Sequence, residues 1–195
     1  MTGERKSDRR VAYTKLVLRE ALIKLMKDQH ISGITVTSIC ELADINRSTF
    51  YLHYTDQFDL LHQIEEEVIE KLGERLAMAQ DRTEGIISGT PVSQDIMIAI
   101  LEYARENIDL AHVLLSENCD FAFQQDILEL AKEVVPFPDA PLSERTKDII
   151  ITHGINGCID VAKRWLKEGA VDEPEEIADL MLQLIYSGTT SFIQK

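Results

Sequence analysis

Apolar side chains recur three and four positions apart along almost the whole chain, which is the spacing of residues on one face of an α-helix. Near the N-terminus this stripe consists of Val11, Leu16, Leu18, Leu22, Ile23, Leu25 and Met26. A second stripe consists of Leu60, Leu61, Ile64, Val68, Leu72 and Leu76. The pattern predicts an all-α protein.

Glycine, proline and capping residues divide this pattern into separate helices. Two glycines and a proline predict a loop over 84–91, and Pro136, Pro138 and Pro141 predict a second one. Thr35 or Thr37 can cap one helix, Asn46 the next, and Thr55 or Asp56 a long third one. The expected helices span about 7–29, 35–43, 47–54, 56 to the first loop, 92–106, 109–116, 121–135, 143–168 and 174–193.

Charge separates the N-terminal end from the rest of the chain. Residues 1–55 hold nine Lys and Arg against six Asp and Glu, whereas the remaining 140 residues hold 11 against 28. An acidic surface repels the phosphates of a nucleic acid, so only the N-terminal end can approach one. We therefore expect a domain over 1–55 that contacts nucleic acid and a second domain over 56–195.

Several classes of protein are not expected from this sequence. No apolar run approaches the roughly 20 residues that span a bilayer, and residues 1–10 are too polar for a secretory signal. Cys40, Cys119 and Cys158 lie far apart, so small buried side chains in a reducing cytoplasm are favoured over a disulfide or metal site. Phosphate-binding glycine loops, nucleophile elbows and clustered metal ligands are lacking, so we expect no enzyme, no metal and no cofactor.

Residues 35–61 form the pattern that indicates a function: a short helix, a three-residue turn and a second short helix. A miniature core is expected from Ile39, Leu42, Ala43, Ile45, Phe50 and Tyr54. Arg47, Ser48 and Thr49 then fill the first turn of the second helix, the part of a recognition helix that enters the major groove. Arg47 can bond guanine edges, and Tyr51 and His53 can hold the backbone. The alternative is a helical hairpin that serves only as core, with Tyr51 and His53 half-buried.

This segment resembles the helix-turn-helix motif of the TetR family of bacterial regulators. The motif positions are matched by Thr35, Ile39, Ala43, Tyr51, His53 and Leu60, with conservative replacements at Cys40 and Tyr54. The likeness covers residues 8–62 by motif and the remainder only by architecture. It implies a homodimer on a (pseudo)palindromic double-stranded operator, modulated by a small effector that changes the tilt of the helix after Asp56. It also implies base contacts from Arg47, Ser48 and Thr49, and phosphate contacts from Thr37, Tyr51 and His53.

Two positions depart from the family motif. Asp44 replaces the usual turn glycine and adds a negative charge, and Gln57 replaces a lysine that contacts phosphate. They keep open an alternative, in which the chain is a co-regulator, or a ligand- or protein-binding module, that does not bind DNA. A second likeness, in residues 45–51 and in Gly157 with Trp165, is to a subgroup that includes the dihydroxyacetone-kinase regulator.

The last two helices are more apolar than the surface of a monomer tolerates. They predict either a monomer core or a four-helix interface between two copies, and we favour the interface, with residues Ile155, Ile159, Leu166, Leu184, Ile185 and Gly188. Gly154 and Gly157 favour close packing, because glycine inside a helix is destabilising unless something offsets it. A ligand cavity could be lined by Tyr103, His112, Cys119, Phe121, Phe123, His153 and Trp165, although such aromatics are more often core.

Overall fold

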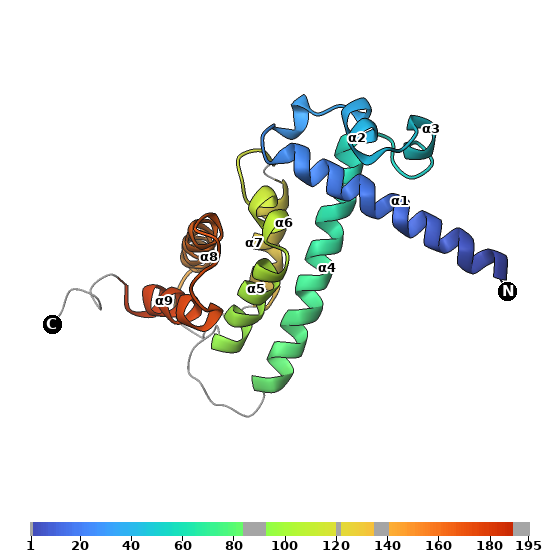
Figure 1. The fold of residues 1–195 in the computed structure, drawn as a ribbon. Helices are drawn as coiled ribbons and strands as arrows, with labels where there is room; N and C mark the ends of the chain where they lie inside the picture. The colour runs from blue at the N-terminus through green and yellow to red at the C-terminus, as the bar shows by residue number, and fades with distance from the viewer. Residues whose placement is uncertain (1, 84–92, 120–121, 135–140, 189–195) are drawn as a thin grey trace. The chain divides into compact units, whose positions relative to one another are not determined.

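The computed structural model describes residues 2–83, 93–119, 122–134 and 141–188, and the regular structure in these ranges is helical throughout (Figure 1). The prediction of an all-α fold is confirmed. The elements in chain order are α1 (Thr2–Met26), the 3-10 helix η1 (Ile31–Gly33), α2 (Val36–Ala43), α3 (Arg47–Phe50), α4 (Gln57–Thr83), α5 (Gln94–Glu106), α6 (Ile108–Leu114), α7 (Ala122–Val134), α8 (Glu144–Lys167) and α9 (Pro174–Ser187). The described chain contains no helix that is both long enough and apolar enough to cross a membrane.

The chain divides into two compact units. The first comprises Met1–Val68 together with Ser116–Asp120, and the second comprises Ile69–Leu115 and Phe121–Lys195. The sequence placed a domain boundary between residues 55 and 56. The first unit reaches further because the opening turns of α4 bury Leu60, Leu61 and Ile64. A boundary between residues 55 and 56, which separates the part expected to contact DNA from the rest, thus stays a prediction.

The core of the first unit is built from one face of each of its helices. Each of α1, α2, α3 and α4 contributes side chains that are almost fully buried, among them Leu18, Leu22, Met26, Ile39, Phe50, Leu60 and Leu61. Each such burial contributes roughly 1.5–3 kcal/mol to the stability of the fold. Because α1 packs on α2 and α2 on α3, this core holds the short helices in place.

The five residues 116–120 belong to the first unit although the helices on either side belong to the second. The backbone N–H of Ile31 donates to the carbonyl of Asn118 over 3.0 Å. The side-chain amide of Asn118 donates to the carbonyl of Met26 over 2.9 Å. These two bonds tie the segment to the end of α1 and to η1.

The helix ends follow the capping chemistry of the sequence. Of the two threonines expected before α2, Thr35 is the cap: its hydroxyl accepts from the N–H of Ser38, and the Ser38 hydroxyl accepts from the N–H of Thr35, both over 3.1 Å. Helix α3 is shorter than the expected span of 47–54. Its last helical residue is Phe50, and residues 51–53 continue as turns.

In the second unit α5 packs against α9, and α6 and α7 pack against α8. The core includes Met97, Leu101, Trp165, Leu166, Ala178 and Met181. The indole N–H of Trp165 donates to the carbonyl of Asp172 over 3.0 Å, which satisfies the polar end of this buried ring. Pro174 begins α9, as expected of a residue that has no N–H to satisfy.

Asp44, which stands at the glycine position of the family motif, ends α2 in the left-handed conformation, with φ 54° and ψ 43°. A residue with a Cβ adopts this conformation at a cost of about 1 kcal/mol or more, and Asp tolerates it better than most. We expect the free energy of unfolding, measured with urea, to follow the order Asp44→Gly, wild type, Asp44→Ala. The alanine variant should be less stable than wild type by about 1 kcal/mol. Equal stability of the two variants would show that the backbone here is unstrained.

Candidate nucleic-acid interface

Helix α3 is a single turn, and two local features hold it. The side-chain oxygen of Asn46 accepts hydrogen bonds from the backbone N–H and the hydroxyl of Ser48, both over 2.9 Å. On the opposite side of the turn Phe50 is completely buried, with its ring 5.6 Å from that of Tyr51 and 5.5 Å from that of Tyr54. One isolated helical turn is not stable in water. The Asn46 cap and the buried Phe50 therefore together determine where the exposed side of α3 points.

The six predicted DNA-contact residues all lie on α2, α3 and the turn after α3. Thr37, Arg47, Ser48 and Tyr51 are exposed, and Thr49 and His53 are partly buried. Tyr51 keeps 50% of its side chain exposed, in contrast to the fully buried Phe50 that precedes it. The contact of these six residues with DNA stays a prediction.

Arg47 and Tyr51 lie one turn apart on the same side of α3. The guanidinium of Arg47 donates to the hydroxyl of Tyr51 over 3.4 Å, and this bond raises the pKa of Arg47. The two side chains therefore present a cation and a phenol together to solvent. This pair can donate to base edges and to phosphate oxygens.

The surroundings of α3 are poor in positive charge. From Asp28 to Glu70 the chain contains one Lys or Arg, which is Arg47, and nine Asp and Glu. A protein gains affinity for duplex DNA mainly through cations that neutralise phosphates. The helix-turn-helix by itself therefore offers a weak electrostatic contact.

The start of α4 adds no cation to this surface. The Asp56 carboxylate accepts from the N–H groups of Phe58 and Asp59, both over 2.9 Å. The Asp59 carboxylate accepts from the N–H of Thr55 over 2.7 Å, and this bond, with one from Gln63, lowers the pKa of Asp59. A helix N-terminus often binds phosphate, but here the chain's own carboxylates occupy it, and Gln57 stands where the family has a lysine.

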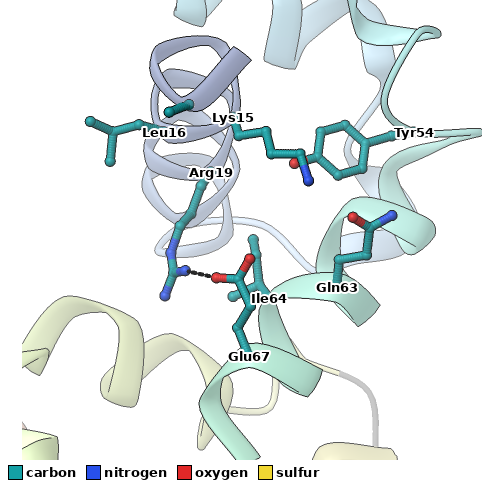
Figure 2. Close-up of a pocket in the computed structure, with 8 residues that line it drawn as sticks. Lys15, Leu16, Arg19, Tyr54, Gln63, Ile64 and Glu67 are labelled. Carbon is teal, nitrogen blue, oxygen red and sulfur yellow. Dashed lines mark hydrogen bonds and ion pairs between the residues drawn. The ribbon is translucent and has the colours of Figure 1, made fainter. Parts of the chain in front are cut away.

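A small cavity of about 200 Å³ lies between α1 and the first turns of α4 (Figure 2). Across it the guanidinium of Arg19 donates to the Glu67 carboxylate over 2.7 Å. Figure 2 shows the Tyr54 hydroxyl pointing towards α1, and burial raises the pKa of Tyr54, with Glu67 and Asp59 adding to the effect. This ion pair connects α4 to α1 within the first unit. No sequence pattern indicates this pair, because its partners are 48 positions apart.

The residues expected to line a ligand cavity differ in their exposure. Tyr103, Phe123 and Trp165 are buried, whereas His112 and His153 are exposed, and Phe121 lies outside the described residues. Trp165 is part of the core, and Cys119 belongs to the first unit. A different set lines a cavity of about 410 Å³ between α4 and α5: Arg75, Met78, Ala79, Asp95, Ile98, Ala99 and Glu102.

The residues expected at a dimer interface differ in their exposure. Ile185 is exposed, and Ile155, Ile159, Leu184 and Gly188 are partly buried. Leu166 is only 3% exposed and packs into the core of its own protomer, so for this residue the monomer-core interpretation holds. Exposed apolar side chains instead occur at Ile149 and Ile150 on α8 and at Leu180 and Tyr186 on α9, beside Ile185.

The described residues contain no group of three or more His, Cys, Asp or Glu side chains that could hold a metal ion. Cys40 and Cys119 are buried and Cys158 is partly buried, and none of the three forms a disulfide. Burial raises the pKa of Cys158 to about 11, which keeps it protonated at neutral pH.

Comparison with known proteins finds similarity to transcriptional regulators. Residues 93–187 match the family model of the TetR transcriptional regulator C-terminal region. The uncharacterized HTH-type transcriptional regulator YxbF of Bacillus subtilis strain 168 is 24% identical over 168 residues, and the match covers 86% of this chain and 43% of that relative. The chain thus spans less than half the length of this relative.

Solved structures share the fold. A TetR transcriptional regulator from Streptococcus agalactiae 2603V is similar with a TM-score of 0.64 at 24% identity, covering 94% of this chain and 99% of that one. The dihydroxyacetone kinase operon activator DhaS gives a TM-score of 0.54 at 20% identity, covering 91% and 97%. A helix-turn-helix followed by a helical C-terminal unit is the arrangement of this chain, and the likeness to these structures extends over nearly its whole length. Residues 93–187 thus match the C-terminal region of TetR transcriptional regulators, and the fold as a whole is similar to that of a solved TetR regulator.

The Asn46 cap generates a prediction about α3. Asn46→Ala removes both bonds to Ser48 and should lower the free energy of unfolding by about 1 kcal/mol. Asn46→Ser can form an equivalent cap and serves as the control, with a smaller loss. Both variants are measured by urea denaturation. An alanine variant as stable as wild type would mean that the buried Phe50 alone holds α3.

Proposed function

We propose that two copies of this chain bind a palindromic DNA site, with one α3 in each of two major grooves, and thereby regulate transcription. The observation that carries the proposal is the side of α3 that faces solvent. A buried phenylalanine and an asparagine cap fix the turn, and Arg47, Ser48 and Tyr51 project from it unburied. These side chains are suited to base edges and phosphates, and their position on the second helix of the motif is the usual one for base contacts.

The apolar surface of α8 and α9 supports a homodimer. Ile149 is 57% exposed, and the side chains of Ile150, Leu180, Ile185 and Tyr186 also face solvent. Within the described residues, a Cβ added at Gly154 or Gly157 would meet nothing within 4 Å. The protomer's own packing therefore does not offset the roughly 1 kcal/mol that each helical glycine costs. The close approach of a second copy would do so, and two-fold symmetry would then place two recognition helices about 34 Å apart.

A small effector would act through the second unit. We place it in the cavity between α4 and α5, which Arg75 lines. Arg75 forms an ion pair with Glu106, and its guanidinium carbon lies 5.0 Å from the centre of the Tyr103 ring. Because α4 also contributes to the first unit, a ligand that prefers one tilt of α4 would change DNA affinity by the same factor as DNA changes ligand affinity. In this proposal the protein is not an enzyme, and it acts in the cytoplasm, where it meets DNA.

The charge of the motif keeps a second candidate function in view. Asp44, Asp56 and Gln57 stand where a DNA-binding surface would benefit from neutral or positive groups. A co-regulator that binds a ligand or a protein, and no DNA, would tolerate these residues. Titration of labelled DNA from upstream of the protein's own gene separates the two functions. Binding that weakens steeply with salt supports the regulator, and undetectable binding supports the co-regulator.

Substitutions on α3 test the proposed docking. Arg47→Ala should change which sequence is preferred and cost about 1–3 kcal/mol at the position it contacts. Tyr51→Phe keeps the ring but removes the hydroxyl, and should weaken binding to all sequences alike. Fluorescence anisotropy with a DNA site selected from random fragments measures both effects. Unchanged affinity and preference in both variants, with folding intact, would exclude this docking of α3.

The proposed dimer predicts a change in molecular mass. Ile185→Glu places a charge at the α9 surface that a second copy would bury, so it should convert the dimer to a monomer in sedimentation velocity. Met78→Glu, at a residue on α4 that is 64% exposed, makes the same chemical change and should leave the dimer intact. A wild-type protein that sediments as a monomer at micromolar concentration would rule out the dimer.

A further inference from the structure

The N-terminal half of α1 projects from the packed part of the first unit. The structure describes the side chains of α1 from Arg9 onwards. Among these the first that is almost fully buried is Leu18, and residues 9–17 are exposed or partly buried. At about 1.5 Å per residue, the helix extends roughly 20 Å from Leu18 to residue 5. In Figure 1 these turns run out beyond the other helices of the unit, towards the side of the view on which α3 lies.

Positive charge is concentrated on one face of this projecting helix. Arg5 and Arg9 are four positions apart, as are Lys6 and Arg10, so the two pairs occupy adjacent columns of the helix. Like charges at this spacing destabilise an isolated helix.

The described side chains of this face are accessible. Arg9 and Arg10 are exposed, and neither forms an ion pair with a side chain that the structure describes. Tyr13 lies four positions after Arg9 and three after Arg10, on the same face, and is 64% exposed. Arginines with a neighbouring phenol suit the phosphate oxygens of a nucleic acid backbone.

This face supplies the charge that the helix-turn-helix lacks. Arg47 is the one Lys or Arg between Asp28 and Glu70, and the start of α4 is occupied by Asp56 and Asp59. We propose that Arg9, Arg10 and Tyr13 form a second DNA-contact surface, which grips phosphates next to the site that α3 reads. This inference rests on the proposed function, because it names the residues that provide most of the protein's electrostatic affinity for DNA.

Phosphate binding has a quantitative signature in salt dependence. Removal of one cation that neutralises a phosphate reduces the slope of log affinity against log salt concentration by about 0.9. The double variant Arg9→Gln/Arg10→Gln should therefore flatten the slope by about two for each bound protomer. It should weaken binding to a selected site and to a mixed-sequence duplex alike, since backbone contacts carry no sequence information. Tyr13→Phe should weaken both without changing the slope.

A matched variant separates local contact from total charge. Lys24→Gln/Lys71→Gln removes the same formal charge from exposed positions outside the face and should leave the slope close to that of wild type. Anisotropy titrations of the full-length protein at several salt concentrations give the slopes, and circular dichroism verifies helix content. An equal change in both double variants would overturn the proposal, because it would assign the effect to net charge.

Other outcomes are distinguishable from that one. If wild type binds DNA and the Arg9→Gln/Arg10→Gln variant keeps its slope, the α1 surface is excluded while the proposed function stands. If wild type binds neither duplex, the proposed function and this inference both fail. Binding of wild type, but not of the double variant, to phosphatidylglycerol vesicles, with an unchanged DNA slope, would assign the cationic face to a membrane and contradict the inference.

Discussion

The position of α3 in the first unit depends on the burial of Phe50. A four-residue helix forms one turn, and one turn has too few backbone hydrogen bonds to persist in water. Phe50 has no exposed surface and packs beside Tyr54, so the turn is fixed by its contact with the core. The Asn46 cap then satisfies an N–H group at the start of the turn. A short helix of this kind is held by its buried side chain and its cap, which leaves its outer side chains available for a partner.

The same core receives a contribution from far along the chain. Glu65 on α4 is 2% exposed, and its carboxylate accepts from the thiol of Cys119 over 3.3 Å. Cys119 and Asn118 belong to the segment 116–120. This segment is part of the first unit, whereas the residues before and after it belong to the second unit. Helix α4 and this segment are thus two covalent routes between the units. In the proposed function, coupling between an effector and DNA would pass along one or both of them.

Much of this fold could be predicted from the sequence, for physical reasons that act locally. Helical periodicity predicted the all-α fold, and the roles of Thr35, Asn46 and Asp44 followed from capping and turn chemistry within four residues. Long-range packing could not be predicted. The Arg19–Glu67 ion pair and the placement of Asn118 against α1 join residues 48 and 92 positions apart. The exposure of individual apolar side chains could not be predicted either. Leu166 and Ile185 have similar hydrophobicity, but Leu166 is buried in the core and Ile185 is exposed to solvent. The candidate DNA contacts lie together because they lie within one short motif, whereas the pocket residues come from distant helices.

The proposed function requires that two copies of the chain present α3 to successive major grooves, which we call paired docking. Protection of guanine N7 from methylation tests paired docking most directly. The experiment uses a site selected from random DNA and the full-length protein. We expect two patches of protected guanines, related by two-fold symmetry and about one helical turn apart, because N7 is exposed in the major groove. Retarded DNA with no guanine protected, or with a single patch, would contradict paired docking of α3.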